Sequence, residues 1–374
     1  MPMTHRERLL AALGHRVGDR VPIAFGGPEC SIHRDAHRRL LEHLGLRRDD
    51  DPPIMDAMLQ IVETDERLYE VFDVDALWLV PSEAPVRWED GGHGYVDELG
   101  RRFRAGGGFY NQIGAPLVDG TAEELRRYCF PDLLAGDRAA GLAAKGGRWR
   151  QAGYGLVGDG AWGIYEVSSS LRGTAELFVD MALRPAYVEE LAERVLEEHI
   201  KPFYTMLLRE VGPWVDMVVI SDDLGDQENL LFSPRLFREV YRPRLRRLVE
   251  HVKGLADVKV YLHSDGAVSE LIPDFIEIGI DGLNPVQYTA RGMAAERLKR
   301  EYGKDLGFFG GGVENEVLSF GSVVDVRRHV QSQVSALKPG GGYIFASIHN
   351  IPPEVPAENV LAFFEAGRES GQYS

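Results

Sequence analysis

The chain has 374 residues, 44% hydrophobic and 27% charged, and its 58 Asp and Glu against 42 Lys and Arg give a formal net charge of -16. These proportions are typical of a globular protein with a large core, and the acidic balance argues against binding to nucleic acid, which requires clustered basic residues. Two cysteines, Cys30 and Cys129, are too few for a disulfide framework and indicate a reducing compartment.

The sequence shows neither a signal peptide nor a membrane span. Charged residues and histidines between His5 and Arg16 surround the short apolar run 9–13, unlike the longer apolar core of a signal peptide. Nowhere does an apolar run reach the roughly 18 residues that a membrane-crossing helix needs. We therefore expect a cytoplasmic protein that interacts with neither membranes nor nucleic acid.

Short apolar, β-rich runs alternate with amphipathic helical stretches along the chain. They lie at residues 21–25, 76–80, 216–220, 258–262, 282–284, 306–309 and 342–346. Strands that alternate with helices indicate parallel pairing through helical crossovers. Roughly eight such units predict a (β/α)8 barrel, the TIM-barrel fold of the α/β class.

Two helix starts and one insertion are also readable. Ser233-Pro234 predicts a helix capped by the serine, and Pro352-Pro353-Glu354 predicts the start of the last helix. Residues 85–150 depart from the alternation, since short polar segments there are separated by glycines, which indicates an inserted hairpin region. We expect residues 1–374 to form a single domain that carries this insertion.

Polar residues follow several of the predicted strands. In a parallel barrel the chemistry occurs at the carboxyl ends of the strands, so these residues are candidates for a site. They are Asp222, Asp223, His263, Asp265, Asn284, Gln287, His349 and Asn350. Glu166, in the stretch 165–173, is a further candidate, either facing the barrel interior or paired with an arginine.

His263, Asp265 and His349 have the residue types of a metal site. His263 and Asp265 project to the same side of an extended chain, and His349 comes from another strand end. Two imidazoles and a carboxylate suit zinc or a harder divalent ion, and leave positions open for substrate. The alternative is a hydrogen-bonded His263 and an Asp265 that caps a helix beginning near Val268.

Only one of the adjacent residues Asp222 and Asp223 is expected to enter the barrel mouth. Consecutive residues of a strand point to opposite faces, so the other would cap or pair. A carboxyl group at the mouth with a raised pKa could serve as a general acid or base.

The ordered segments resemble the uroporphyrinogen decarboxylase superfamily, which contains true decarboxylases and corrinoid- and coenzyme M-type methyltransferases. The matching segments are residues 4–13 with 19–22, 222–225, 263–266 with 271–273, 279–287, 310–313, 339–344 and 349–352. They extend over nearly the whole chain, and the resemblance implies a TIM barrel.

Within that superfamily the sequence is closer to the methyltransferase branch. True decarboxylases hold the carboxylates of their substrate with an Arg-rich N-terminal motif, whereas the matching stretch 23–29 contains no arginine. The methyltransferases hold zinc through a His-x-Cys motif and a later cysteine, at positions that correspond to His263, Asp265 and His349. Replacing two thiolates by a carboxylate and an imidazole leaves a metal site but puts coenzyme M in doubt as the acceptor.

The resemblance therefore implies a metal-dependent methyltransferase. It would move a methyl group between a small methylated or methoxylated compound and a corrinoid on a separate protein, and a homodimer is expected because family members are often dimers. We assign acid–base or orienting roles to Asp222, Asp223 and Glu166, and substrate contacts to Asn284, Gln287 and Asn350. The alternatives are a metal-independent decarboxylase or lyase acting on a carboxylated substrate, and a non-catalytic protein that binds a tetrapyrrole or corrinoid.

Overall fold

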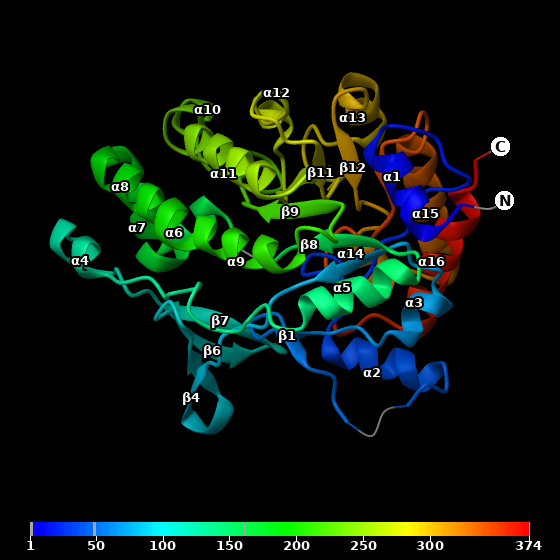
Figure 1. Cartoon of the computed structure of the whole chain (residues 1–374), viewed down its shortest axis with the longest axis horizontal. Coiled ribbons are helices and arrows are strands. Elements are labelled where there is room, and N and C mark those ends of the chain that lie inside the picture. Colours follow the sequence, from blue (N-terminus) through cyan, green and yellow to red (C-terminus); the bar gives the residue numbers. More distant parts are fainter. Residues whose placement is uncertain (1–2, 48–49, 161, 374) are drawn as a thin grey trace.

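A parallel β-sheet forms the centre of the fold. The computed structural model describes residues 3–47, 50–160 and 162–373. Within these ranges, a 7-stranded sheet has its strands in chain order, and all of its neighbouring strands are parallel (Figure 1). The strands are β3 (Ala76–Leu79), β8 (Gly155–Gly158), β9 (Met217–Ser221), β10 (Lys259–His263), β11 (Gly282–Asn284), β12 (Gly307–Phe309) and β13 (Tyr343–Ile344).

The segment around Ile23 closes this sheet into a barrel. Ile23 forms a parallel bridge to Phe345, beyond the end of β13, and Ala24 forms one to Ala76 in β3. The Ala24 N–H donates to the carbonyl of Phe345 and the Phe345 N–H to that of Pro22, both at 2.9 Å. The extended segment predicted at 21–25 thus lies between the two edge strands, and the predicted (β/α)8 fold is confirmed.

Side chains alternate between the inside and the outside of the barrel, as the pleat of a strand requires. The interior cluster contains Trp78, Val219, Tyr261 and Phe309. The intervening residues, such as Ile220 and Leu262, pack in the larger cluster against the helices. Ser221 and His263 lie two residues beyond Val219 and Tyr261, so this alternation directs both toward the barrel axis.

Helices connect and surround the strands (Figure 1). Among the described residues, no helix is both long enough and apolar enough to cross a membrane. The α-helices are α1 (His5–Leu13), α2 (Arg34–His43), α3 (Arg67–Val71), α4 (Ala122–Arg127), α5 (Leu142–Gln151), α6 (Ile164–Arg172), α7 (Thr174–Leu183), α8 (Pro185–Val195), α9 (Lys201–Val211), α10 (Pro234–Leu236), α11 (Arg242–Leu255), α12 (Ile272–Glu277), α13 (Ala295–Tyr302), α14 (Asn315–Phe320), α15 (Val323–Leu337) and α16 (Ala357–Ser370). Short 3₁₀ turns are η1 (Asp90–Gly92) and η4 (Ser269–Leu271), and π-helical turns are η2 (Leu196–Ile200) and η3 (Phe237–Tyr241).

The two predicted helix starts have different outcomes. The Ser233 side chain accepts a hydrogen bond from the Leu236 N–H and caps α10, as predicted. The last helix, however, begins at Ala357 rather than at Pro352. Pro356 explains the difference, because a proline disfavours helical backbone in the residue before it, here Val355.

The π-helical turns also have a local cause in the sequence. Each lies immediately before a helix whose second residue is a proline, Pro202 after η2 and Pro243 after η3. A proline inside a helix cannot donate its N–H, and its ring clashes with the carbonyl four residues earlier. Widening the helix by one residue relieves that clash.

The region 85–150 contains the predicted insertion. Strands β4 (Arg87–Glu89), β5 (Gly94–Val96), β6 (Arg102–Gly106) and β7 (Phe109–Gly114) form a 4-stranded antiparallel sheet. This sheet projects from the barrel at the lower left of Figure 1, with α4 farther out. A smaller pair, β1 (Ile54–Asp56) and β2 (Ile61–Val62), precedes it. The end of the region is the barrel helix α5, so the insertion is shorter than predicted.

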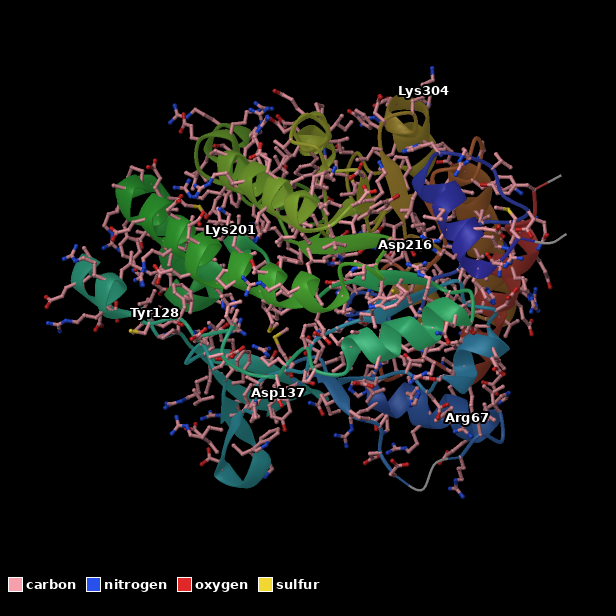
Figure 2. All side chains as sticks on the ribbon, viewed as in Figure 1. Arg67, Tyr128, Asp137, Lys201, Asp216 and Lys304 are labelled. Atoms are coloured by element: carbon pink, nitrogen blue, oxygen red, sulfur yellow. The ribbon has the colours of Figure 1, made fainter. Side chains whose placement is uncertain are left out.

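Buried carboxylates tie the amino ends of the strands to α1 and its flanking segment. Asp75, directly before β3, is 0% exposed and accepts hydrogen bonds from the Ile23 N–H at 2.7 Å and from Arg20 Nη1 at 2.5 Å. Asp216, directly before β9 and beside α1 in Figure 2, accepts from Arg6 Nε at 3.0 Å and Arg150 Nη1 at 2.9 Å. These pairs stabilise the end of the barrel opposite the polar strand ends.

Candidate functional site

His263, Asp265 and His349 come together at the carboxyl end of the barrel. His263 is the last residue of β10, Asp265 follows two residues later, and His349 lies in the loop after β13. One ligand atom from each of the three lies within 4.8 Å of those of the other two. The structure therefore places the three predicted ligands where a single ion could contact all of them.

Asn284 fixes the orientation of the His263 ring. His263 Nδ1 lies 2.6 Å from Asn284 Oδ1, and Asn284 Nδ2 donates to the carbonyl oxygen of Phe309 at 3.3 Å. Because that carbonyl can only accept, the Asn284 oxygen faces His263, and Nδ1 must be the donor. In the neutral ring the lone pair of His263 is then on Nε2, the atom available to a metal. Burial lowers the pKa of His263, but the charges of Asp265 and Asp223 outweigh it and raise the pKa to about 9, so a metal would displace the Nε2 proton. Asn284 itself is fully buried behind the ring, and its predicted contact with substrate stays a prediction.

Asp265 carries a buried oxygen that fits a cation. Its Oδ1 has no hydrogen-bond partner among the described residues, and η4 begins at Ser269 without a side-chain cap, so Asp265 does not cap that turn. Its N–H donates to Asp223 Oδ1 at 2.8 Å. Burial raises the pKa of Asp265, and the two histidines partly offset this effect. A buried carboxylate oxygen without a partner is costly, and a bound cation would remove that cost.

Asp223 and Asp222 point in opposite directions, as the alternation of a strand predicts. Asp223 lines the cavity in front of the metal residues, and its Oδ1 is 3.9 Å from His263 Nε2. Asp222 instead accepts from the Tyr165 and Glu166 N–H groups, both at 3.0 Å, at the start of α6. Asp223 is thus placed to meet a substrate, while Asp222 holds α6 in position.

Glu166 lies beside Asp223 in the lining of the cavity. Its Oε2 accepts from Ser221 Oγ and the Gly163 N–H, both at 3.1 Å. Burial, and after it the charge of Asp223, raises the pKa of Glu166 to about 7. No hydrogen bond or ion pair joins Glu166 to an arginine within the described ranges. Of the two positions expected for Glu166, the structure therefore shows the one that faces the barrel interior.

Gln287 and Asn350 bind backbone near the site. Gln287 Oε1 accepts from the Gly266 N–H at 2.7 Å, which fixes the turn after Asp265. Asn350 Oδ1 accepts from the Ser31 N–H at 2.7 Å, and its Nδ2 donates to the Pro28 carbonyl at 2.6 Å. Both side chains therefore hold the loops that frame the cavity, and their predicted contact with substrate is still to be tested.

The cavity in front of these residues, which we call the site cavity, has a volume of about 270 Å³. Its lining contains Glu29, which the sequence did not single out. Burial and the neighbouring Asp159 raise the pKa of Glu29 well above its ordinary value, and burial raises that of Asp159 to about 6. These effects favour the protonated form of Glu29, in the lining that also contains His263 and His349. Glu29 and Asp159 both follow barrel strands, and this position in the sequence could have identified them as candidate site residues.

Comparison with known proteins identifies the family. The uroporphyrinogen decarboxylase (URO-D) family model matches residues 161–370. A solved methyltransferase from Methanosarcina mazei has 20% sequence identity and a TM-score of 0.69, over 98% of this chain and 99% of that one. Two glycoside hydrolases are too distant in structure to carry an argument. Xylanase 10B from Thermotoga maritima has 11% identity and a TM-score of 0.33, over 64% of this chain and 92% of that one. A GH113 beta-1,4-mannanase has 10% identity and a TM-score of 0.40, over 93% of this chain and 99% of that one. No curated protein sequence matches. Because the family model spans more than half of the chain, the protein belongs to the uroporphyrinogen decarboxylase family.

Proposed function

We propose that this protein is a metal-dependent methyltransferase that moves a methyl group between a small methylated or methoxylated compound and a corrinoid carried by a separate protein. The carrying observation is the convergence of His263, Asp265 and His349 within 4.8 Å, with a carboxylate oxygen of Asp265 buried and unpartnered. The likeness of the whole fold to a protein named a methyltransferase is consistent with this assignment.

His263, Asp265 and His349 would hold the ion, with zinc as the first expectation because it accepts imidazole and carboxylate ligands in an open site. When bound, a divalent ion would act as a Lewis acid on the heteroatom that carries the methyl group. Asn284 keeps His263 Nε2 directed at the site, and Asp223 fixes the backbone of Asp265.

Glu29 would supply the proton that the reaction requires. Transfer to a reduced corrinoid would move the methyl group without its bonding electron pair, so the donor heteroatom would keep that pair. An ether oxygen left as an alkoxide or phenolate would then take the proton of Glu29, whose protonated form the raised pKa of this carboxyl favours. Asp159 stabilises that protonated form by repelling a charge on Glu29.

Metal analysis of the full chain, purified without chelators, tests the site directly. We expect about one equivalent of a divalent ion, lost in His263→Ala and in His349→Ala and retained in the control His251→Ala. His251 bonds Thr205 Oγ1 and the Lys201 carbonyl, away from the site. Transfer is then followed by absorbance with free cob(I)alamin as acceptor and a panel of methoxylated and methylated donors. A metal-free parent protein that decarboxylates carboxylated compounds in the presence of chelator would refute the proposal and favour a lyase.

A further inference from the structure

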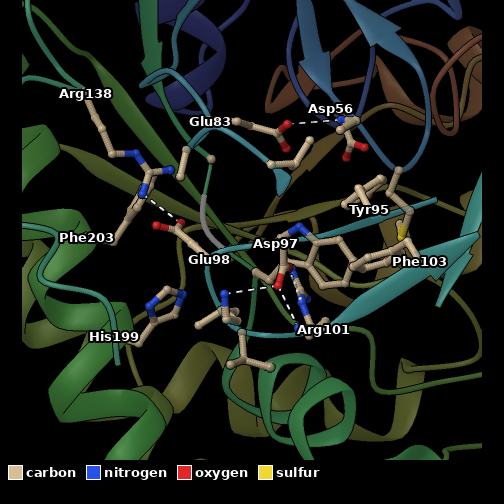
Figure 3. Close-up of a pocket in the computed structure, with 18 residues that line it drawn as sticks. Asp56, Glu83, Tyr95, Asp97, Glu98, Arg101, Phe103, Arg138, His199 and Phe203 are labelled. Atoms are coloured by element: carbon tan, nitrogen blue, oxygen red, sulfur yellow. Dashed lines mark hydrogen bonds and ion pairs between the residues drawn. The ribbon is translucent and has the colours of Figure 1, made fainter. Parts of the chain in front are cut away.

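A second cavity, which we call the antechamber, adjoins the site cavity. It has a volume of about 110 Å³ and lies between the inserted sheet, α6 and the α8–η2–α9 helix (Figure 3). The two cavities have lining residues in common, among them Asp56, Glu83, Arg138, Trp162 and Phe203. A small molecule at the metal residues could therefore extend into the antechamber.

Two arginines line the antechamber with unused donors. Arg101 donates through Nε to Asp97 at 2.6 Å and through Nη1 to Ser170 at 3.2 Å. Arg138 donates through Nε to the Ser82 carbonyl at 2.8 Å and through Nη1 to Glu98 at 2.9 Å. Figure 3 shows the Asp97–Arg101 and Glu98–Arg138 pairs as dashed lines. The Nη2 group of each guanidinium has no hydrogen-bond partner in the described part of the chain, although the other donors hold the side chain in place.

His199 adds a neutral donor to the same lining. It is 9% exposed, and its Nδ1 is buried without a hydrogen-bond partner among the described residues. It lies in the π-helical turn η2, shortly before Pro202, and such turns are frequent at functional sites. Burial, and after it the charges of Arg101 and Arg138, lowers the pKa of His199 to about 4. The two guanidiniums thus give the imidazole a positive surrounding.

The carboxyl groups of the antechamber balance the charges of the two arginines but leave their Nη2 donors free within the described ranges, so the attraction for an anion comes from these donors rather than from a net positive charge. Asp56, whose pKa burial raises, also lines the cavity. Asp97 and Glu98 each form an ion pair with one of the arginines. Burial and the neighbouring Asp56 raise the pKa of Glu83 to about 8, so this group is neutral at pH 7 and can itself donate a hydrogen bond. The rest of the wall is aromatic and includes Tyr95, Phe103, Trp162 and Phe203.

We propose that the antechamber binds the carboxylate of an organic acid through Arg101, Arg138 and His199, with the aromatic wall covering its apolar body. A planar carboxylate accepts several N–H donors at once, and guanidinium and imidazole groups are its usual partners. Resting on the proposed function, the inference adds that the methyl donor is itself such an acid. Its reactive end lies in the site cavity, and its carboxylate lies in the antechamber.

Benzoate is a suitable probe because it carries the anion and a flat apolar ring but no methyl group to transfer. Its binding to the full chain, measured by calorimetry, is compared with that of the neutral isostere benzamide and the cation benzylammonium. We expect benzoate to bind best, and Arg138→Gln to weaken benzoate by about tenfold or more while leaving benzamide unchanged. The control Arg104→Gln removes an exposed arginine of β6 that does not line the antechamber.

Metal-stripped protein and His263→Ala separate this inference from the proposed function. Benzoate that still binds to them, and still responds to Arg138→Gln, supports the antechamber site whatever the outcome of the methyl-transfer assay. Benzoate binding that disappears with the metal would show coordination to the ion, and would overturn the inference while leaving the metal site intact. Equal affinities for benzoate and benzamide, or stronger binding of benzylammonium, would also overturn it. His199→Phe provides a second variant that does not disturb either ion pair, and it is expected to weaken benzoate.

Discussion

The hydrogen bond between Asn284 and His263 allows a sharp test of the metal centre. Asn284→Leu removes the acceptor that fixes the Nδ1 proton of His263, at a site where the donor–acceptor distance is 2.6 Å. The ring would then be free to rotate or to change tautomer, and Nε2 would face the ligand cluster only part of the time. Loss of such a partner typically costs 10–100-fold in metal affinity, which corresponds to about 1.4–2.7 kcal/mol.

The assay is competition for zinc between the protein and a chromophoric chelator, with thermal unfolding of the metal-free protein as a check on the fold. Asn284→Asp is the matched variant, because its carboxylate still accepts the Nδ1 proton although it cannot donate to the Phe309 carbonyl. We expect Asn284→Asp to retain zinc and Asn284→Leu to bind it 10–100-fold more weakly. Equal zinc affinity in Asn284→Leu and the parent, together with loss of zinc in His263→Ala, would refute the orienting role.

Three further outcomes follow from the structure. Glu29→Gln should slow methyl transfer from methyl ethers by about 10²–10⁴-fold with metal content unchanged. Transfer from quaternary ammonium donors should not slow, because their departing nitrogen is neutral and needs no proton. An equal loss with both donor types would contradict the role of Glu29 as proton donor. Asp75→Ala should lower the free energy of unfolding in urea by about 3–5 kcal/mol, because the buried Arg20 loses its buried carboxylate partner and keeps only the more exposed Asp73. A change under 1 kcal/mol would count against the Arg20–Asp75 ion pair as a support of the barrel. The pKa of His199 is about 4 in the folded protein against an ordinary 6.5, so the unfolded chain binds the proton first as the pH falls. The free energy of unfolding should therefore fall by about 3 kcal/mol as the pH drops from 6.5 to 4. Urea unfolding across that pH range measures this loss, which should be absent in His199→Phe.

The fold was largely predictable because barrel strands buried on both faces produce continuous apolar runs. The strand β8 escaped detection, since its sequence Gly-Leu-Val-Gly contains only two apolar side chains between glycines. Tertiary packing explains the first of these glycines, because a Cβ on Gly155 would lie 2.4 Å from Leu9 Cδ2 of α1. Contacts between segments so far apart in the chain leave no local periodicity to find.

The convergence of His263, Asp265 and His349 was predictable from the fold, whereas that of the antechamber residues was not. His263 and Asp265 share one strand end, and His349 lies in the loop after another strand of the same barrel, so the fold alone brings them to one rim. Asn284 was also predicted to lie at that rim, but only the register between β10 and β11, in which His263 is the partner of Asn284, shows that it contacts the ring.

The antechamber, by contrast, depends on how an insertion folds back over the barrel. Arg101 and Arg138 belong to the region 85–150, while His199 lies on a helix between two barrel strands, and no strand register relates them. His199 faces the cavity from a π-helical turn, and helical periodicity assigns faces only to regular helices. Residues that an inserted segment contributes to a substrate cavity are therefore the hardest to predict from the sequence of a barrel protein. Polar residues at the strand ends are easier, because the fold itself brings them together.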